Sequence, residues 1–217
     1  MQNKLKTCLL VLITSLWVGL SVYGVKRLLD YSSEAGVNGV IPIEWPSQSK
    51  IERQKNVPIL IMFVHPKCPC TRASLAELKK ILAVSKSKSN LIVTVVFSKA
   101  AFSATDWEKD FLWESVKNIE EIQTYVDLEN HEAKMFGINT SGQTVLYDEN
   151  GHLIFHGGIT ASRGHEGDNL GQITIINYLK NGSLNCTTTK AYGCLIYANS
   201  LESSTCCQIE EKESKNE

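Results

Sequence analysis

The sequence has no excess of either charge sign and only one long apolar run, and each absence excludes a class of protein. Its 22 basic and 23 acidic residues leave a formal net charge of −1, so the chain as a whole offers no electrostatic reason to bind nucleic acid. A single long apolar run and a mean hydropathy of −0.11 exclude a polytopic membrane protein. No internal repeat, low-complexity tract, P-loop or dinucleotide-binding glycine pattern is present. The apolar fraction of 43% and the length of 217 residues are those of one folded domain with extensions.

The one long apolar run lies at the N-terminus and predicts a membrane anchor. Residues 8–25 carry no charge, and two lysines precede them while Lys26 and Arg27 follow. A membrane-spanning helix needs about 20 apolar residues, whereas a cleaved signal peptide has a shorter apolar region and then a small-x-small site. That site is poor here, so we expect an uncleaved anchor over residues 1–29. The free amino terminus favours a cytoplasmic N-terminus, which places the rest of the chain on the extracytoplasmic, periplasmic side of the inner membrane.

Two polar segments flank the expected domain. Residues 30–56 contain several serines, glycines and prolines, which indicates a linker that is either a tether or a loosely docked strand. Residues 201–217 carry five glutamates and two lysines, which predicts an acidic, disordered tail. The domain is therefore expected over residues 57–200.

Between these segments the hydrophobic pattern predicts strands alternating with helices. Residues 57–64 and 91–97 are continuous apolar runs, typical of strands buried on both faces, and residues 74–84 between them have helical spacing. The later expected elements are a helix from a cap at Asp106 to about Lys117, a strand at 123–126, a short helix at 129–136, a hairpin of 144–148 with 153–156 around Gly151, and a last helix at 170–179 capped by Asp168 or Asn169. The order is β-α-β-α-β-α-β-β-α, an α/β fold.

A cysteine pair follows the first predicted strand directly. Residues 63–70 read FVHPKCPC, so Cys68 and Cys70 are separated by Pro69 alone. If Cys68 caps the helix, Pro69 takes the first helical position, where proline is favoured. The helix N-terminus then lowers the pKa of Cys68 from about 8.5. We therefore expect Cys68 to be an exposed attacking thiolate and Cys70, inside the first turn, to be the resolving thiol.

Three stretches of the sequence resemble thioredoxin-like proteins. Residues 63–70 resemble their strand-to-helix turn, residues 127–138 their "D-x-(D/E)…(Y/F)-G-V" segment, and residues 146–151 their "lfd-x-x-G" turn. The resemblance covers about residues 57–180. It implies a thioredoxin-like fold, with a central mixed sheet flanked by helices, and thiol–disulfide exchange with protein thiols or disulfides. No cofactor is implied for that chemistry.

Within this superfamily, two stretches resemble bacterial RedB-type proteins, namely residues 65–78 and 157–169. Two departures from the thioredoxin pattern limit what can be carried over. The pair is C-x-C instead of C-x-x-C, with Thr71 at the fourth position, and residues 141–143 replace the expected cis-proline. A disulfide within C-x-C closes a smaller ring and should be strained and oxidising. This favours disulfide donation or shuffling.

A copper site is the second hypothesis, because two thiolates near histidines suit Cu(I) or another soft metal. The cysteines resemble those of Sco-type copper-assembly proteins in being membrane-anchored on a thioredoxin-like domain, although the Sco spacing is C-x-x-x-C. A late histidine would complete such a site, and His152, His156 and His165 are the candidates. A third hypothesis is an interaction module without turnover.

Further residues are candidates for supporting roles around the cysteines. His65 adjoins the pair and is expected to tune Cys68. The glycine-rich loop at residues 157–169 should reach the cysteine end of the sheet and hold Arg163 and His165 beside Cys68.

The last cysteines carry two competing expectations. Residues 191–196, AYGCLI, form an apolar island that should dock on the domain. Cys194 would then join Cys68 and Cys70 as a third redox partner or metal ligand. The alternative is a local disulfide between Cys186 and Cys194. The adjacent pair at 206–207 is expected to be mobile and incidental.

Overall fold

The computed structural model describes residues 2–37, 39–88, 90–100 and 111–197, and the chain divides into two compact units between Glu34 and Ala35. The first unit is a single helix, α1 (Gln2–Ser33), whose residues are almost all exposed. It contains the expected anchor at residues 8–25. In the described part of the chain it is the one helix long and apolar enough to cross a membrane, since 32 residues exceed the roughly 20 that a span needs.

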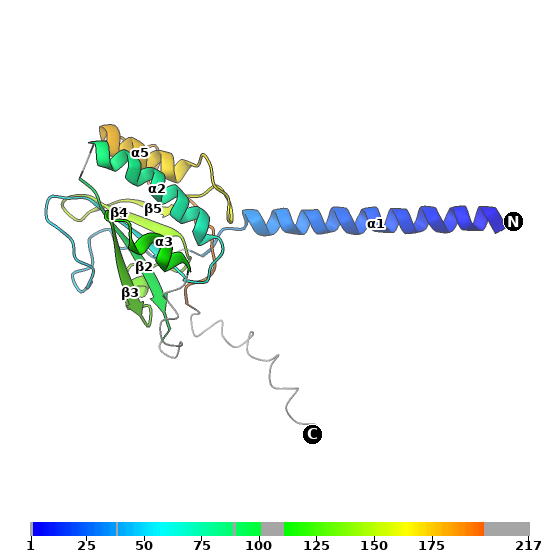
Figure 1. The fold of residues 1–217 in the computed structure, drawn as a ribbon, viewed down its shortest axis with the longest axis horizontal. Helices are drawn as coiled ribbons and strands as arrows, with labels where there is room; N and C mark the ends of the chain where they lie inside the picture. Colours follow the sequence, from blue (N-terminus) through cyan, green and yellow to red (C-terminus); the bar gives the residue numbers. More distant parts are fainter. Residues whose placement is uncertain (1, 38, 89, 101–110, 198–217) are drawn as a thin grey trace, which may run out of the picture. The chain divides into compact units, whose positions relative to one another are not determined.

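The second unit is built on a five-stranded mixed sheet (Figure 1). Its strands are β1 (Ile59–Val64), β2 (Ile92–Lys99), β3 (Ile122–Leu128), β4 (Gln143–Tyr147) and β5 (Leu153–Gly158), in the spatial order β3-β2-β1-β4-β5. The first three strands are parallel, β4 pairs antiparallel to β1, and β5 pairs antiparallel to β4. This is the α/β connectivity that the sequence predicted for a thioredoxin-like fold.

The central strand explains how the two faces of the sheet are used. All six residues of β1 are buried, as its continuous apolar run predicted. Leu60, Met62 and Val64 point into one core, beneath α2 (Thr71–Lys88), α3 (Phe111–Lys117) and α5 (Leu170–Asn181). Figure 1 shows α2 and α5 side by side on that face. Ile59, Ile61 and Phe63 face a second core on the opposite side.

That second core is closed by α4 (His131–Met135) together with residues 35–56, most of the expected linker. Ile41 and Ile51 are buried there. The carboxylate of Glu132 accepts hydrogen bonds from the Ser49 hydroxyl and the Lys50 backbone N–H, at 2.7 and 2.9 Å. The segment therefore lies against the domain and belongs to its core.

Helix boundaries follow local signals where the structure describes them. The Asn169 side chain caps α5 by accepting from the Gln172 backbone N–H at 2.8 Å, and Gly182 ends the helix at a φ of 74°. The expected cap Asp106 lies outside the described residues. So do the expected tail at residues 201–217 and the cysteine pair at 206–207.

After α5 the chain returns across the sheet edge as a segment that we call the strap, residues 186–197. It first runs beside β5, where Thr187 and Thr189 exchange backbone hydrogen bonds with His156. It then crosses to the loop before β4, where Thr140 and Leu195 form an antiparallel bridge. Ile196 is buried at the end of the strap, so the apolar island docks on the domain.

Candidate active site at the strand-to-helix turn

The two cysteines lie in the turn that joins β1 to α2. The turn is closed by the Thr71 backbone N–H, which donates to the Cys68 carbonyl at 3.1 Å. The first helical carbonyl is that of Cys70, which accepts from Ser74 at 3.5 Å. The expectation that Cys68 caps the helix and that Pro69 takes the first helical position is therefore wrong. Helical geometry is disfavoured for the residue before a proline, and residues 68–71 form a tight turn before the helix instead.

The expectation that Cys68 is exposed is also wrong, because its exposed fraction is 0%. The strap covers it, and the Cys194 backbone N–H donates to the Cys68 Sγ at 3.4 Å. The strap is held there by two backbone hydrogen bonds of 2.8 Å, from Ser141 to the Cys194 carbonyl and from Ile196 to the Asn139 carbonyl. Backbone pairing between segments far apart in the sequence thus closes the site.

The electrostatics of the site distinguish Cys68 from its neighbours. Burial raises the pKa of Cys68, but hydrogen bonds from the thiol and backbone N–H of Cys194 and from Thr71 outweigh it, so the net pKa is lowered. Burial and the negative charge of Cys68 both raise the pKa of Cys70. Burial and the hydrogen bond to Cys68 raise the pKa of Cys194 to about 12. Of the three thiols, Cys68 therefore loses its proton most readily.

A series of hydrogen bonds through two hydroxyl groups leads to the Cys68 sulfur. The His65 backbone N–H donates to the Ser141 Oγ at 2.8 Å, and Ser141 and Thr71 join their hydroxyls at 2.7 Å. A hydroxyl has one proton to donate. If the Thr71 hydroxyl donates its proton to the Cys68 sulfur, the Thr71 oxygen must accept the proton of the Ser141 hydroxyl. The Ser141 oxygen in turn accepts from the His65 backbone N–H. Both hydroxyl residues are buried, so their hydrogen bonds are shielded from water.

Arg163 lies beside the other two cysteines. Its Nη1 donates to the Gly193 carbonyl on the strap at 2.6 Å. Its charge opposes the burial that raises the pKa of Cys70, and it acts in the same direction on Cys194. The loop at residues 157–169 therefore reaches the cysteines, as expected, but Arg163 acts on Cys70 and Cys194 and is not among the groups that shift the pKa of Cys68.

The histidines take less direct positions. His65 is half-buried, and its Nδ1 accepts from the Lys67 backbone N–H at 3.3 Å. Burial, then the charge of Lys67, lowers the pKa of His65. His165 is exposed and takes no part in the interactions recorded at the three sulfurs. His152 lies near Glu44 and Asp148 at the hairpin.

Two further thiols are described, one in each unit. Cys8 is on α1, and Cys186 contacts the Thr174 hydroxyl at 3.3 Å. Cys186 and Cys194 are both free thiols, so the alternative local disulfide is not formed. No group of three or more His, Cys, Asp or Glu side chains suited to a metal ion is found in the described part of the chain. The copper hypothesis stays a prediction that rests on the cysteines alone.

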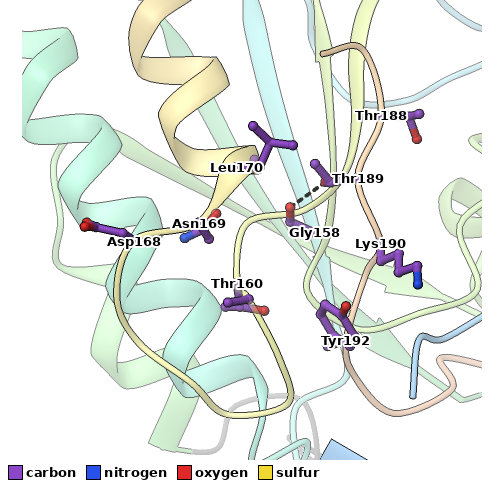
Figure 2. A pocket seen from close by; sticks show the side chains of 11 residues that line it. Gly158, Thr160, Asp168, Asn169, Leu170, Thr188, Thr189, Lys190 and Tyr192 are labelled. Atoms are coloured by element: carbon purple, nitrogen blue, oxygen red, sulfur yellow. Dashed lines mark hydrogen bonds between the residues drawn. The ribbon is translucent and has the colours of Figure 1, made fainter. Parts of the chain in front are cut away.

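Two of the hollows in the second unit lie at the strap and at the cysteine turn, respectively. One of about 600 Å³ lies between β5, the start of α5 and strap residues Thr188–Tyr192. Figure 2 shows its lining, including the hydrogen bond of 2.7 Å from Thr189 to the Gly158 carbonyl, and no cysteine takes part. The other, of about 150 Å³, is lined by Pro66, Lys67, Cys68, Pro69, Arg72, Phe111 and Leu112. The smaller hollow is the one that borders Cys68.

Two residues of the site were not among the sequence candidates. Ser141 was noted only as part of the replacement for the missing cis-proline. Gly193 appeared only within the apolar island at residues 191–196; it fits against Ser141, where a Cβ would lie 1.9 Å from the Ser141 carbonyl oxygen. The signal for both was local, a polar residue replacing a proline and a glycine before a cysteine. The contact between Ser141 and Gly193 joins distant parts of the sequence and has no local signal.

No family model matches the chain, and no curated protein matches it. Among solved structures it is similar to an uncharacterised conserved protein of Geobacillus kaustophilus, at 15% identity and a TM-score of 0.55, covering 77% of this chain and 94% of that one. It is also similar to a hypothetical protein of Sinorhizobium meliloti, at 19% identity and a TM-score of 0.54, covering 78% and 97%. An exposed lipoprotein thioredoxin of Streptococcus pneumoniae matches more weakly, at 18% identity and a TM-score of 0.42, over 58% and 84%.

The chain therefore has a thioredoxin-like fold, as its sequence predicted. Identities this low establish the fold alone. The closer resemblance to RedB-type proteins is untested by these matches and stays a prediction.

Proposed function

We propose that this chain is a thiol–disulfide oxidoreductase tethered to a membrane by α1, with Cys68 as the attacking thiolate and Cys70 as a resolving thiol. The proposal rests on one observation above all: hydrogen bonds from Cys194 and Thr71 lower the pKa of Cys68, while the pKa of each neighbouring thiol is raised. The thiolate is the nucleophilic form of a cysteine. A site with one thiolate beside a protonated thiol has the asymmetry that exchange requires.

The exchange balances as two displacements. The Cys68 thiolate attacks one sulfur of a substrate disulfide, forms a mixed disulfide, and releases the other substrate sulfur as a thiolate that takes up a proton. Cys70 then loses its proton and attacks the Cys68 Sγ, which forms the Cys68–Cys70 disulfide and releases the second substrate thiol. The substrate gains two electrons and the chain loses two. The reverse sequence donates the disulfide to a dithiol.

The hollow beside Cys68 supports a protein partner, which the proposal places on the extracytoplasmic side. Lys67 and Arg72 border the hollow of about 150 Å³, and the Arg72 guanidinium lies 5.0 Å from the Phe111 ring centre. A hollow this small admits a sulfur and its neighbouring atoms but not a large ligand. A protein cysteine entering from outside fits these dimensions, and a tether on α1 would hold the domain near membrane proteins or secreted proteins.

The test is turnover of a protein disulfide by the purified full-length chain in detergent, with thiol counting after each step. We expect Cys68→Ser to abolish exchange, and the double variant Cys70→Ser/Cys194→Ser, which keeps no thiol beside Cys68, to trap substrate on Cys68. Cys186→Ser is the matched control, because that thiol contacts the Thr174 hydroxyl on α5 and takes no part in the interactions at Cys68, and it should exchange like the unaltered chain.

Two results would contradict the proposal and favour the alternatives. If the reduced chain shows no exchange but binds one Cu(I) tightly, and Cys68→Ser abolishes binding, the copper function is supported. If it neither exchanges nor binds metal, the domain is an interaction module.

A further inference from the structure

We propose that Cys194 is a second resolving thiol, so that Cys68 forms disulfides with two partners and the one to Cys194 locks the strap over the site. This inference rests on the proposed function of Cys68. It extends that function to a residue 126 positions away in the sequence.

The strap holds Cys194 against Cys68 before any bond forms. The distance of 3.4 Å from the Cys194 backbone N to the Cys68 Sγ puts the Cys194 Cα within about 5 Å of that sulfur, since an N–Cα bond adds about 1.5 Å. The Cys68 sulfur lies about 3 Å from its own Cα, so the two Cα atoms are at most about 8 Å apart, a limit that includes the roughly 4.4–6.8 Å of disulfide partners. The thiol of Cys194 also hydrogen-bonds to Cys68. The two sulfurs are therefore already in contact.

Both sides of Cys194 are fixed by backbone contacts. On one side, Gly193 is held by the Arg163 guanidinium and fits against the Ser141 carbonyl, where no side chain has room. On the other, Leu195 pairs with Thr140, and the Ile196 side chain is buried in the second core. A thiol held this firmly beside its target attacks with a high effective concentration.

The charge changes during exchange favour attack by Cys194. While Cys68 is a thiolate, its hydrogen bond and charge add to burial in keeping Cys194 protonated. Once Cys68 enters a mixed disulfide, that negative charge is gone, while the lowering influence of Arg163 on the pKa of Cys194 remains. Cys194 therefore becomes easier to deprotonate at the step that needs its thiolate.

The step balances without a further reactant. Starting from a mixed disulfide, the Cys194 thiol gives its proton to water, its thiolate attacks the Cys68 Sγ, and the substrate thiolate leaves and is protonated. Starting from the Cys68–Cys70 disulfide, the same attack transfers the bond and leaves Cys70 as a thiol. The small ring closed by a C-x-C disulfide is strained, so release of that strain favours transfer of the bond from Cys70 to Cys194.

The test uses the full-length chain in detergent with Cys8, Cys186, Cys206 and Cys207 replaced by Ser, so that three thiols remain. Cys70→Ser and Cys194→Ser are then compared in this background. Each is incubated with oxidised glutathione, quenched in acid, alkylated, and mapped by mass spectrometry without reduction. We expect the Cys70→Ser chain to lose both thiols and give a peptide linking Cys68 to Cys194. Adding Cys194→Ser to it should slow release of glutathione from Cys68 by at least about 100-fold.

The outcomes separate this inference from the proposed function. If Cys194→Ser links Cys68 to Cys70 while Cys70→Ser stops at a glutathione adduct, Cys68 is the nucleophile and the inference about Cys194 is wrong. If neither chain acquires glutathione or a disulfide at Cys68, the proposed function fails first. Circular dichroism of each variant shows whether the fold is intact.

Discussion

The residues beneath Cys68 act together in setting its protonation. Ser141 and Thr71 share a hydrogen bond of 2.7 Å, and Thr71 contributes to lowering the pKa of Cys68 through both its hydroxyl and its backbone N–H. The backbone donor survives any substitution at Thr71, but the hydroxyl donor does not. The hydroxyl contribution can therefore be measured separately from the turn that positions it.

Thr71→Val removes that hydroxyl with little change in shape. A hydrogen bond to a charged group contributes about 1.5–3 kcal/mol, so we expect the thiolate fraction of Cys68 at neutral pH, and its alkylation rate, to fall by about tenfold. Thr187→Val is the matched control, because Thr187 is exposed on the strap. An alkylation rate that is equal in both variants and the unaltered chain would show that the Thr71 hydroxyl does not lower the pKa of Cys68.

The lowered pKa of Cys68 also predicts how stability depends on pH in the reduced chain. Burial opposes the shift, but hydrogen bonds from Cys194 and Thr71 lower the pKa overall. A thiol whose folded pKa lies below its unfolded value of about 8.5 stabilises the fold fully above pH 8.5, and that contribution is lost as pH falls through the folded pKa.

We therefore expect the free energy of unfolding of the reduced chain, relative to Cys68→Ser, to rise as pH increases toward about 8.5. Urea denaturation over a pH series with excess reductant measures it. A difference that stays flat or falls over that range would mean that the folded chain does not favour the thiolate.

At the residue scale, sequence reasoning identified the reactive pair but misjudged its surroundings. Cys68 and Cys70 were found because a cysteine pair after a buried strand is a local signal. The exposure of Cys68 was predicted wrongly, because what covers it comes from residues 193–196, over a hundred positions later. Burial by a distant segment leaves no trace near the cysteine itself.

At the scale of elements, the strap is the part of the structure that the site depends on most. Gly193 is its closest approach to the domain, since a Cβ there would lie 1.9 Å from the Ser141 carbonyl oxygen. Real Cβ atoms do not come this near, and the contacted atom is backbone. A side chain at this position must therefore move the strap or the loop before β4.

Gly193→Ala should destabilise the second unit by about 1–3 kcal/mol, the usual cost of overpacking. It should also speed hydrogen exchange at the Ser141 and Ile196 amides, which donate to the Cys194 and Asn139 carbonyls and so join the strap to the loop before β4. Gly19→Ala is the control, since nothing lies within 4 Å of its added Cβ. Unchanged exchange at both amides would show that the strap does not depend on close packing at Gly193.

The elements themselves were largely predictable, because each carries its own period and end signals. Continuous apolar runs predicted β1 and β2, and Asn169 and Gly182 marked the ends of α5. The start of α2 was placed two residues too early, at Pro69 instead of Thr71, because a helix cap and a tight turn before a helix place proline in similar ways. Residues 35–56 carry turn residues throughout, so their docking depends on two isoleucines that no period reveals.

At the scale of the whole molecule, the two compact units predict that the second folds without α1. A chain beginning at residue 35 should be soluble and folded, whereas one beginning at residue 57 loses Ile41 and Ile51 from the second core. Burying an isoleucine contributes about 1.5–3 kcal/mol, so the shorter chain should be several kcal/mol less stable. Urea midpoints of the two chains measure this difference. Equal midpoints, or aggregation of the longer chain, would contradict the division.

The fold class of the whole molecule was predictable from the order of its elements, because few folds place a cysteine pair after a buried strand and end in a hairpin and a helix. The assembly of three sulfurs was raised as an expectation but could not be decided, since a local disulfide between Cys186 and Cys194 competed with it. Only the path of the strap separates them: it takes Cys186 to Thr174 on α5 and Cys194 to Cys68.

The central claim is that Cys68 is the thiolate of the site, and the most direct measurement is its alkylation rate as a function of pH. The reduced full-length chain is labelled over a pH series, and each cysteine is quantified by peptide mass spectrometry. The account predicts that labelling of Cys68 reaches half its maximal rate below the pH of an ordinary cysteine, about 8.5, and that Cys70 and Cys194 do so above it. If Cys68 titrates with or above its two neighbours, the assignment of the nucleophile is wrong.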